Sequence, residues 1–293
     1  MNNQRYMFNN VRNVEIEISS QCNRSCSYCP KRLAEREKEL FPMDLFVKIM
    51  GELKEIGYFG AIAFHQYNEP LMEYDYLLEC MATAKRINPK SRLELYTNGD
   101  YLTKKRYKEL RKAGLNRLVI TCHLAPCEKW TAELGEAKVK AMMKKLGIRG
   151  VIESDETSSQ RRPSAVKDYI YTMKEFGYEG VKKYPFRLQI RCMDLDNCGS
   201  TRMGTVTLSH TFSEEEDPQT YYCYSLMHAL HISYKGNAYI CCDTCEGVKG
   251  IEKYIIGSVK DEKVYDIFAK KRPFIEKYLD GEIGLCRTCA FNR

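Results

Sequence analysis

Short apolar runs alternate with longer amphipathic stretches along the first two thirds of the chain. Val14, Ile16 and Ile18 alternate with polar residues, which predicts a first strand at residues 14–18. Later strands are predicted at residues 61–64, 93–96, 118–120, around Val151 and at 187–191. Helices are predicted between them at residues 41–56, 76–87, 104–113, 136–146 and 164–175, several of them ended by a glycine.

Repeated alternation of strand and helix predicts parallel βαβ units. Either a doubly wound sheet or a partial barrel satisfies this pattern. Acidic and turn residues gather at residues 213–218, which predicts a boundary between a domain of residues 1–212 and one of residues 213–293. In the second part, two apolar runs flank Lys235-Gly236-Asn237 and predict a β-hairpin.

The composition is that of a soluble globular protein. The chain has 293 residues, of which 44% are hydrophobic and 29% charged. No apolar run approaches the roughly 20 residues of a membrane span. The polar N-terminus lacks a secretory signal, so we expect a cytoplasmic protein without a membrane partner. The net charge of +7 is spread along predicted helices, and no motif indicates nucleic-acid binding.

Fourteen cysteines are many for a cytoplasmic chain, where cysteines more often bind metal than form disulfides. Cys22, Cys26 and Cys29 form a C-x3-C-x2-C motif directly after the first predicted strand. Three thiolates can hold three irons of a 4Fe–4S cluster, which leaves one iron open for a substrate or cofactor. A zinc knuckle or a disulfide pattern is the alternative interpretation.

The placement of this motif resembles the radical S-adenosylmethionine (SAM) enzymes. The resemblance implies a partial (β/α)6 barrel whose active site lies at the C-terminal ends of the strands. It implies that the open iron chelates SAM, and that electron transfer cleaves SAM to methionine and a 5′-deoxyadenosyl radical. It also implies a flavodoxin- or ferredoxin-type electron donor, and places Tyr28 beside the adenine of SAM.

Three further segments resemble SAM-binding motifs of this family. Residues 67–71 resemble G-G-E-P-L, which binds the SAM amino group, although Tyr67 and Asn68 replace the glycines. Residues 97–99 resemble the T-N-G element, and residues 199–204 resemble N-R-x-G with a threonine in place of asparagine. The cofactor-binding residues that the resemblance implies, besides Tyr28, are Asn68, Glu69, Pro70, Thr97, Asn98, Gly99 and Arg202.

Oxidation of a substrate also needs a group that accepts a proton. Polar residues at the predicted strand ends are candidates for this role, although a lone histidine there is more often a local hydrogen-bonding residue. The candidate catalytic residues are His65, His123, Arg191 and Asp194.

The C-terminal cysteines predict a second metal site. Twelve residues separate Cys223 from Gly236, four separate Gly236 from Cys241, and Cys286-x2-Cys289 follows. This pattern resembles the SPASM/Twitch domain, which implies an auxiliary 4Fe–4S cluster held by these four cysteines. A zinc ribbon is the alternative, since Cys242-x2-Cys245 and Cys286-x2-Cys289 form two CxxC pairs. The remaining cysteines are expected to be small buried residues: Cys80, Cys122, Cys127, Cys192 and Cys198.

These observations predict a radical SAM oxidoreductase whose auxiliary cluster accepts an electron from the substrate radical. The expected substrate is a small alcohol or sugar-like molecule, because no peptide-recognition domain is expected before residues 14–18. A peptide-modifying maturase is the alternative. A non-catalytic iron–sulfur or zinc protein is a further alternative, against which the two SAM-like loops at residues 67–71 and 97–99 argue.

Overall fold

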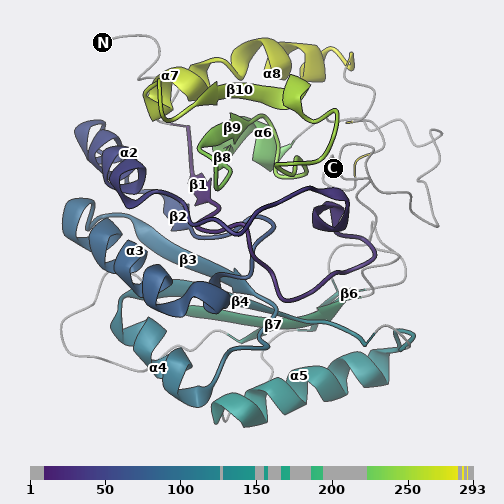
Figure 1. Cartoon of the computed structure of the whole chain (residues 1–293). Coiled ribbons are helices and arrows are strands. Elements are labelled where there is room, and N and C mark those ends of the chain that lie inside the picture. Colours follow the sequence, from purple (N-terminus) through teal and green to yellow (C-terminus); the bar gives the residue numbers. More distant parts are fainter. Residues whose placement is uncertain are drawn as a thin grey trace.

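The computed structural model describes residues 10–125, 128–148, 155–157, 166–171, 186–193 and 223–282, together with Cys286 and Cys289. Its centre is a row of parallel strands (Figure 1). They are, in spatial order, β8 (Ala229–Ile232), β1 (Asn13–Ile16), β2 (Ala61–Ala63), β3 (Arg92–Thr97), β4 (Leu115–Cys122) and β7 (Arg187–Met193). This arrangement confirms the α/β partial barrel.

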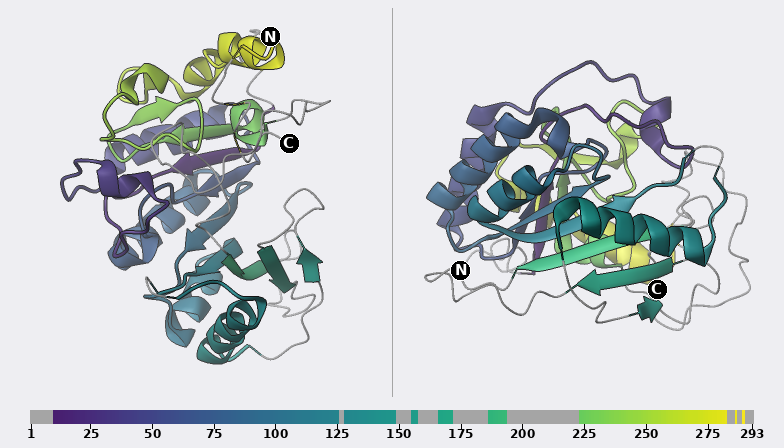
Figure 2. Two further views of the ribbon diagram at one scale, coloured as in Figure 1. Left: turned by 90° about the vertical axis from the view of Figure 1, so that its right-hand side faces the viewer. Right: turned by 90° about the horizontal axis from the view of Figure 1, so that it is seen from below.

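Helices follow the strands and cover one face of the sheet (Figures 1 and 2). They are α2 (Met43–Glu55), α3 (Tyr74–Ile87), α4 (Lys104–Lys112) and α5 (Ala132–Leu146), with the short 3-10 turns η1 (Pro30–Leu33) and η2 (Pro70–Glu73). Thr103 caps α4 by accepting a hydrogen bond from the Arg106 amide at 3.1 Å. Thr131 caps α5 in the same way, so that helix begins earlier than the pattern predicted.

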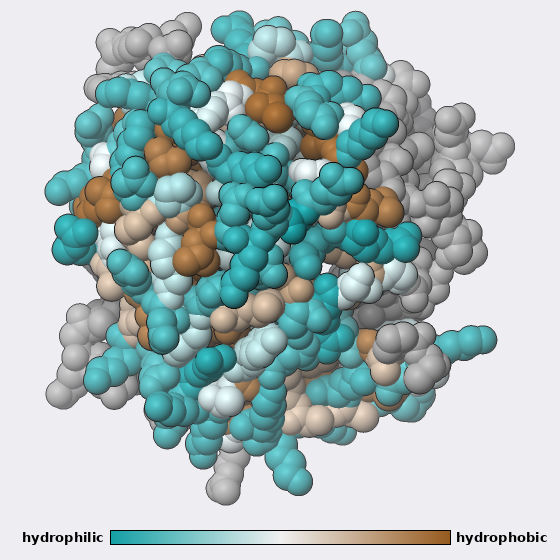
Figure 3. Space-filling view, viewed as in Figure 1, coloured by the Kyte–Doolittle hydropathy of each residue, from teal (hydrophilic) through white to brown (hydrophobic). Residues whose placement is uncertain are grey.

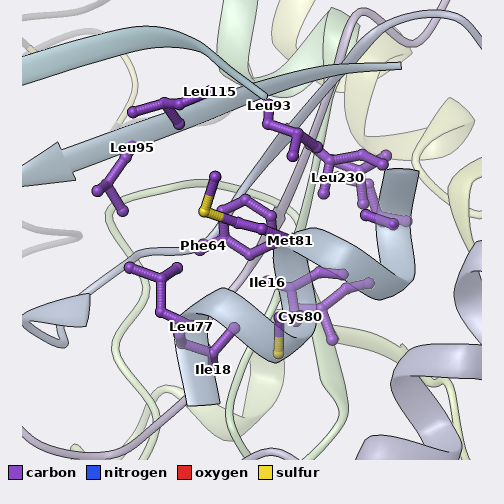
Figure 4. Packing of buried hydrophobic residues seen from close by; sticks show 14 of the residues in the cluster. Ile16, Ile18, Phe64, Leu77, Cys80, Met81, Leu93, Leu95, Leu115 and Leu230 are labelled. Carbon is purple, nitrogen blue, oxygen red and sulfur yellow. The ribbon is translucent and has the colours of Figure 1, made fainter. Parts of the chain in front are cut away.

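The main core lies between these helices and the sheet. In β1 the alternate apolar residues Val14 and Ile16 are fully buried there. Side chains from β1, from α3 and from Phe64, which directly follows β2, pack together, among them Ile16, Leu77 and Met81 (Figure 4). Three of the cysteines predicted to be buried lie in this core, which confirms their role: Cys80, Cys122 and Cys192. Cys127 and Cys198 lie outside the described residues.

One predicted helix is wrong. Residues 166–171, expected within a helix over 164–175, form the strand β6 (Val166–Tyr171), which pairs antiparallel with β7. Valine, isoleucine and tyrosine favour an extended backbone, and ladder pairing with β7 satisfies the peptide groups. The strand β5 (Asp155–Thr157) pairs with β6 at the sheet edge. The strand expected around Val151 lies outside the described residues, and β7 pairs directly with β4.

The predicted hairpin is confirmed and extends the sheet. β8 turns at Gly236, whose φ is 85°, into β9 (Asn237–Tyr239), and β10 (Ile255–Ser258) pairs with β9. The remaining elements after residue 223 are α6 (Tyr224–His228), η3 (Glu252–Tyr254), α7 (Val264–Ala269) and α8 (Arg272–Leu279). Because β8 pairs with β1, one sheet runs through both predicted domains (Figure 2). The boundary at residues 212–213 lies outside the described residues and stays a prediction.

The surface is mixed in character. Polar residues cover most of the face in Figure 3, with apolar residues scattered among them. Among the residues that the structure describes, no helix is both long and apolar enough to cross a bilayer.

Candidate active site

The cysteine loop, residues 20–30, leaves the C-terminal end of β1 and leads into η1. Cys22, Cys26 and Cys29 are half-buried, and the Cys29 amide donates to the Cys26 carbonyl at 3.1 Å. Burial raises the pKa of Cys22 to about 11, so its thiolate needs a cation beside it. Three thiols on one loop are the donor set that an iron–sulfur cluster requires. No three cysteine, histidine or carboxylate groups already have metal-binding geometry in the described part. The assignment as ligands therefore rests on spacing and chemistry.

Two ion-pairing residues attach the cysteine loop to the turn after β3. Arg24 donates two hydrogen bonds to the Asp100 carboxylate, both at 2.7 Å. The Asn23 side chain donates through Nδ2 to the same carboxylate at 2.7 Å, and the Asn98 side chain donates through Nδ2 to Asn23 Oδ1 at 2.8 Å. Sequence reasoning missed Arg24 and Asp100, because no motif or periodicity links residues 76 positions apart.

Glu69 connects the SAM-like segments at residues 67–71 and 97–99 with the cysteine loop, whereas the third such segment, residues 199–204, lies outside the described residues. Its Oε1 accepts from the Thr97 hydroxyl at 2.6 Å and from the Leu71 amide at 3.1 Å, and its Oε2 accepts from the Asn98 amide at 2.7 Å. Its own amide donates to the Gln21 carbonyl at 2.7 Å. Burial raises the pKa of Glu69, while these hydrogen bonds oppose the rise. A carboxylate has about four acceptor positions, so one remains for a ligand.

The other predicted SAM-binding residues hold the same loops in shape. The Asn68 side chain accepts from the Gln66 amide at 3.0 Å and donates to the Phe64 carbonyl at 3.4 Å, so it serves its own loop. Pro70 is buried at the start of η2. Gly99 has a φ of 76°, and a Cβ there would lie 2.7 Å from Met142 Cε. Arg202 lies outside the described residues.

Tyr28 and His123 form a pair beside the cysteine loop. The Tyr28 hydroxyl is hydrogen-bonded to His123 Nδ1 at 2.5 Å, and the two rings are nearly parallel with centroids 6.2 Å apart. Burial lowers the pKa of His123 to about 4, so the imidazole is neutral at pH 7. His123 is thus already engaged by the residue that the resemblance places beside adenine.

The sheet face opposite the helices is polar. Arg117 lies 3.4 Å from the Glu94 carboxylate and donates to Gln189 at 3.3 Å, which links β3, β4 and β7. On β7, Arg191 donates to the Thr121 hydroxyl at 2.9 Å. These residues alternate with the apolar ones that face the helices. The barrel interior is therefore charged and hydrogen-bonded.

His65 follows β2 and reaches the same interior. Its ring stacks on Tyr96 with centroids 4.1 Å apart. Its Nδ1 is buried and makes no hydrogen bond with the part of the chain that is described. Burial lowers the pKa of His65 to about 4, and Arg191 and Arg117 add to this effect. The structure thus brings His65 and Arg191 within electrostatic reach of each other, whereas Asp194 lies outside the described residues.

Sequence reasoning missed a hydrogen-bonded chain that crosses from the barrel to the hairpin. His231 on β8 is bonded through Nδ1 to Glu15 on β1 and through Nε2 to the Ser225 hydroxyl, both at 2.8 Å. Burial raises the pKa of Glu15, but the hydrogen bond and charge of His231, together with the charges of His65 and Lys271, outweigh burial and leave that pKa below its ordinary value. The sequence signal that could have indicated this contact was Glu15, a carboxylate within the alternating pattern of the first predicted strand.

Most of the C-terminal cysteines gather beside α6. Cys223 caps α6, where its sulfur accepts from the Leu226 amide at 3.5 Å. Cys241 is hydrogen-bonded to Cys242, the charge of Cys242 acts on Cys223, and that of Cys223 acts on Cys286. Cys289 lies 3.9 Å from the carboxylate of Asp243, which follows Cys242. The four predicted auxiliary ligands thus share one region of the structure. Cys242, which is not one of the four, lies in the same region.

Cys245 lies elsewhere. Its sulfur is 4.0 Å from an Arg36 nitrogen, and it packs in a small cluster with Tyr67 and Tyr239. Cys29 of the cysteine loop borders this cluster. Arg36 in turn pairs with the buried Glu17 at 2.6 Å. The structure therefore does not gather the four cysteines that a zinc ribbon would need.

Comparisons with known proteins agree with these two regions. The model of the radical SAM superfamily matches residues 16–181, and that of SPASM, an iron–sulfur cluster-binding domain, matches residues 223–290. The S-adenosyl-L-methionine-dependent 2-deoxy-scyllo-inosamine dehydrogenase of Niallia circulans is 39% identical over 119 residues, 40% of this chain and 47% of that protein. The tungsten-containing aldehyde ferredoxin oxidoreductase cofactor-modifying protein of Pyrococcus furiosus is 25% identical over 161 residues, 55% of this chain and 44% of that protein. The matched regions thus span about half the length of these relatives.

The fold is shared more widely than the sequence. The crystal structure of BtrN in complex with AdoMet and 2-DOIA superposes with a TM-score of 0.59 at 21% identity, covering 96% of this chain and 92% of that chain. The family matches imply a 4Fe–4S cluster with SAM, and an auxiliary iron–sulfur cluster. Because the first match covers more than half of its residues, the chain belongs to the radical SAM superfamily.

Proposed function

We propose that this enzyme oxidises an alcohol carbon of a small, polar, cyclitol- or sugar-like molecule to a ketone. SAM bound at the cluster on Cys22, Cys26 and Cys29 supplies the radical that removes the hydrogen atom from the carbon. The substrate then loses one electron and one proton, which completes a two-electron oxidation. The Niallia circulans relative, named as a dehydrogenase of an aminocyclitol, supports this substrate class.

The polar barrel interior carries the proposal. Arg117, Glu94 and Gln189 form a hydrogen-bonded row across three strands, and Arg191 is held by Thr121. Such a lining supplies donors and acceptors for hydroxyl and amino groups and does not suit an apolar substrate. It lies on the sheet that joins the cysteine loop to the C-terminal cysteines.

His65 is the proposed proton acceptor. Its neutral imidazole has a buried Nδ1 that makes no hydrogen bond within the described residues, whereas His123 is bonded to Tyr28. A base must reach the proton that it removes; His65 lies on the barrel face, and the other histidine near it, His231, has both ring nitrogens bonded, to Glu15 and Ser225. Arg191, whose charge acts on His65, is proposed to orient the substrate hydroxyl.

The proposed electron acceptor is a cluster held by Cys223, Cys241, Cys286 and Cys289. Their shared region and the separate place of Cys245 support iron over a zinc ribbon. A flavodoxin- or ferredoxin-type protein is proposed to reduce the first cluster, and the cytoplasm is the proposed location.

Deuterium transfer tests the proposal directly. Anaerobically reconstituted enzyme is incubated with SAM, a reductant and aminocyclitols that carry deuterium on the alcohol carbon. We expect one deuterium in 5′-deoxyadenosine and the ketone of the same cyclitol by mass spectrometry. The triple Cys22→Ala, Cys26→Ala and Cys29→Ala variant is the control and should give neither. Deuterium transfer from labelled peptides and from no cyclitol or sugar would contradict the proposed substrate class.

A further inference from the structure

Lys271, between α7 and α8, is a charged residue with no exposed surface. Its ammonium donates to the Ala229 carbonyl at 2.6 Å and to the Ser225 carbonyl at 3.3 Å. Ser225 lies in α6, and Ala229 is the first residue of β8, which follows α6 directly. The long side chain therefore places its charge behind the residues that follow Cys223.

A buried ammonium normally pairs with a carboxylate, because desolvation of an unpaired charge is strongly unfavourable. Within the described residues, Lys271 forms no such ion pair. Glu15 is the carboxylate whose field reaches it, and Glu15 is already hydrogen-bonded to His231 at 2.8 Å. Two carbonyl dipoles and the Phe268 ring, 5.7 Å away, are its remaining partners.

Two of the proposed cluster ligands lie near Lys271. Cys223 stands two residues before Ser225, whose carbonyl accepts from Lys271, and the Ser225 hydroxyl accepts at 3.1 Å from the backbone amide of Cys242, the residue after Cys241. The charges of Cys241 and Cys223 act on Lys271 more strongly than that of Glu15. Buried thiols are neutral unless they bind metal, so these groups become anionic when a cluster forms. An iron–sulfur cluster with four thiolates is itself an anion, and positive charge nearby stabilises its reduced form.

We propose that Lys271 is the buried counter-ion of the auxiliary cluster and raises its reduction potential. This inference rests on the proposed function, in which that cluster accepts an electron from the substrate. A higher potential makes the cluster a better acceptor. Lys271 is thus a positioning and tuning residue that does not touch the substrate.

The test isolates the auxiliary cluster in full-length protein that carries Cys22→Ala, Cys26→Ala and Cys29→Ala. Lys271→Met is added, because methionine keeps the length of the side chain without its charge. Lys270→Met is the matched control, since Lys270 is an exposed neighbour paired with Glu262. A potentiometric titration followed by electron paramagnetic resonance measures the midpoint. We expect Lys271→Met to disfavour reduction at least tenfold, a fall of about 59 mV for one electron, and Lys270→Met to leave the midpoint unchanged.

Iron and sulfide counts distinguish failure of the proposed electron acceptor from failure of the proposed role of Lys271. If the parent without the first cluster holds no iron, the auxiliary cluster and hence the proposed electron acceptor are wrong. If Lys271→Met holds full iron at the parental midpoint, the cluster stands and the role of Lys271 is refuted.

Unfolding of metal-free protein covers the case in which the variant loses its cluster. A counter-ion is needed only when the thiols are charged, so metal-free Lys271→Met should be at least as stable as the metal-free parent. Loss of iron from a variant that folds normally without metal supports the proposal. A metal-free variant that does not fold shows a purely structural role and overturns it.

Discussion

Glu69→Gln is expected to weaken SAM binding about ten- to hundred-fold without loss of iron. Glutamine keeps the shape of the side chain and removes its negative charge. If the free acceptor position of Glu69 receives the SAM amino group, the variant loses a charge-assisted hydrogen bond worth roughly 1.5–3 kcal/mol. The cysteine loop keeps all three thiols, so iron and sulfide counts should equal those of the parent.

The same substitution also disturbs the protein, because the carboxylate accepts three internal hydrogen bonds, from Thr97, Leu71 and Asn98. An amide nitrogen cannot accept, so at least one of these donors loses its partner. We expect a loss of roughly 1–3 kcal/mol in the free energy of unfolding. Thr97→Val separates the two effects, because it removes one donor and keeps the charge. It should lower stability while changing SAM affinity much less than Glu69→Gln does.

Three measurements decide whether Glu69 binds SAM or only stabilises the turn. They are anaerobic equilibrium binding of labelled SAM, iron and sulfide analysis, and thermal unfolding. Glu73→Gln is the matched control, since Glu73 lies on the same turn and pairs with exposed Lys38 at 3.7 Å. Its SAM affinity should equal that of the parent. Parental SAM affinity in Glu69→Gln with a full iron complement would show that Glu69 only holds the turn.

Three further outcomes are expected. Reconstituted parent should hold about eight irons, and loss of the three thiols of the cysteine loop should leave about four and abolish SAM cleavage; unchanged cleavage would refute the first cluster site. Cys223→Ala should lose about four irons under anaerobic conditions, whereas Cys245→Ala should keep them, since Cys245 lies beside Arg36; one zinc per chain that disappears in Cys245→Ala would restore the zinc ribbon. Because His231 holds the pKa of Glu15 below its ordinary 4.5, their interaction stabilises the fold above that pH and is lost as the pH falls; Glu15→Gln should flatten the acid side of the stability profile, and an unchanged profile would contradict this linkage.

The strands and helices that the sequence predicted correctly are those with strong local signals. The alternation in residues 14–18, the cap at Thr103 and the turn at Gly236 each act within a few residues. The segment 166–171 failed because ladder pairing with β7 determines its conformation, and that partner lies some 20 residues away. Pairing of β8 with β1 could not be predicted for the same reason, since more than 200 residues separate these strands.

The residues of the candidate site also divide into those that a local motif indicates and those that only long-range contacts bring together. The cysteine spacing and the loop at residues 67–71 are local motifs, and the structure joins them through Glu69 and Gln21. Pairs such as Arg24 with Asp100 and His231 with Glu15 leave no local trace, because each partner alone is an ordinary polar residue. Tertiary structure alone brings such partners together.

Tyr67 departs from the family pattern, and its contacts in the structure give a reason for the departure. It stands where the resembling motif has a glycine, which weakened the match on sequence alone. Its amide donates to Glu17 at 3.0 Å, and its hydroxyl donates to the Cys242 carbonyl at 2.9 Å. A glycine would lose this second bond. The side chain therefore connects the loop that carries Glu69 to the turn that carries Cys241. A residue that belongs to neither ligand set thus links the two candidate cluster regions.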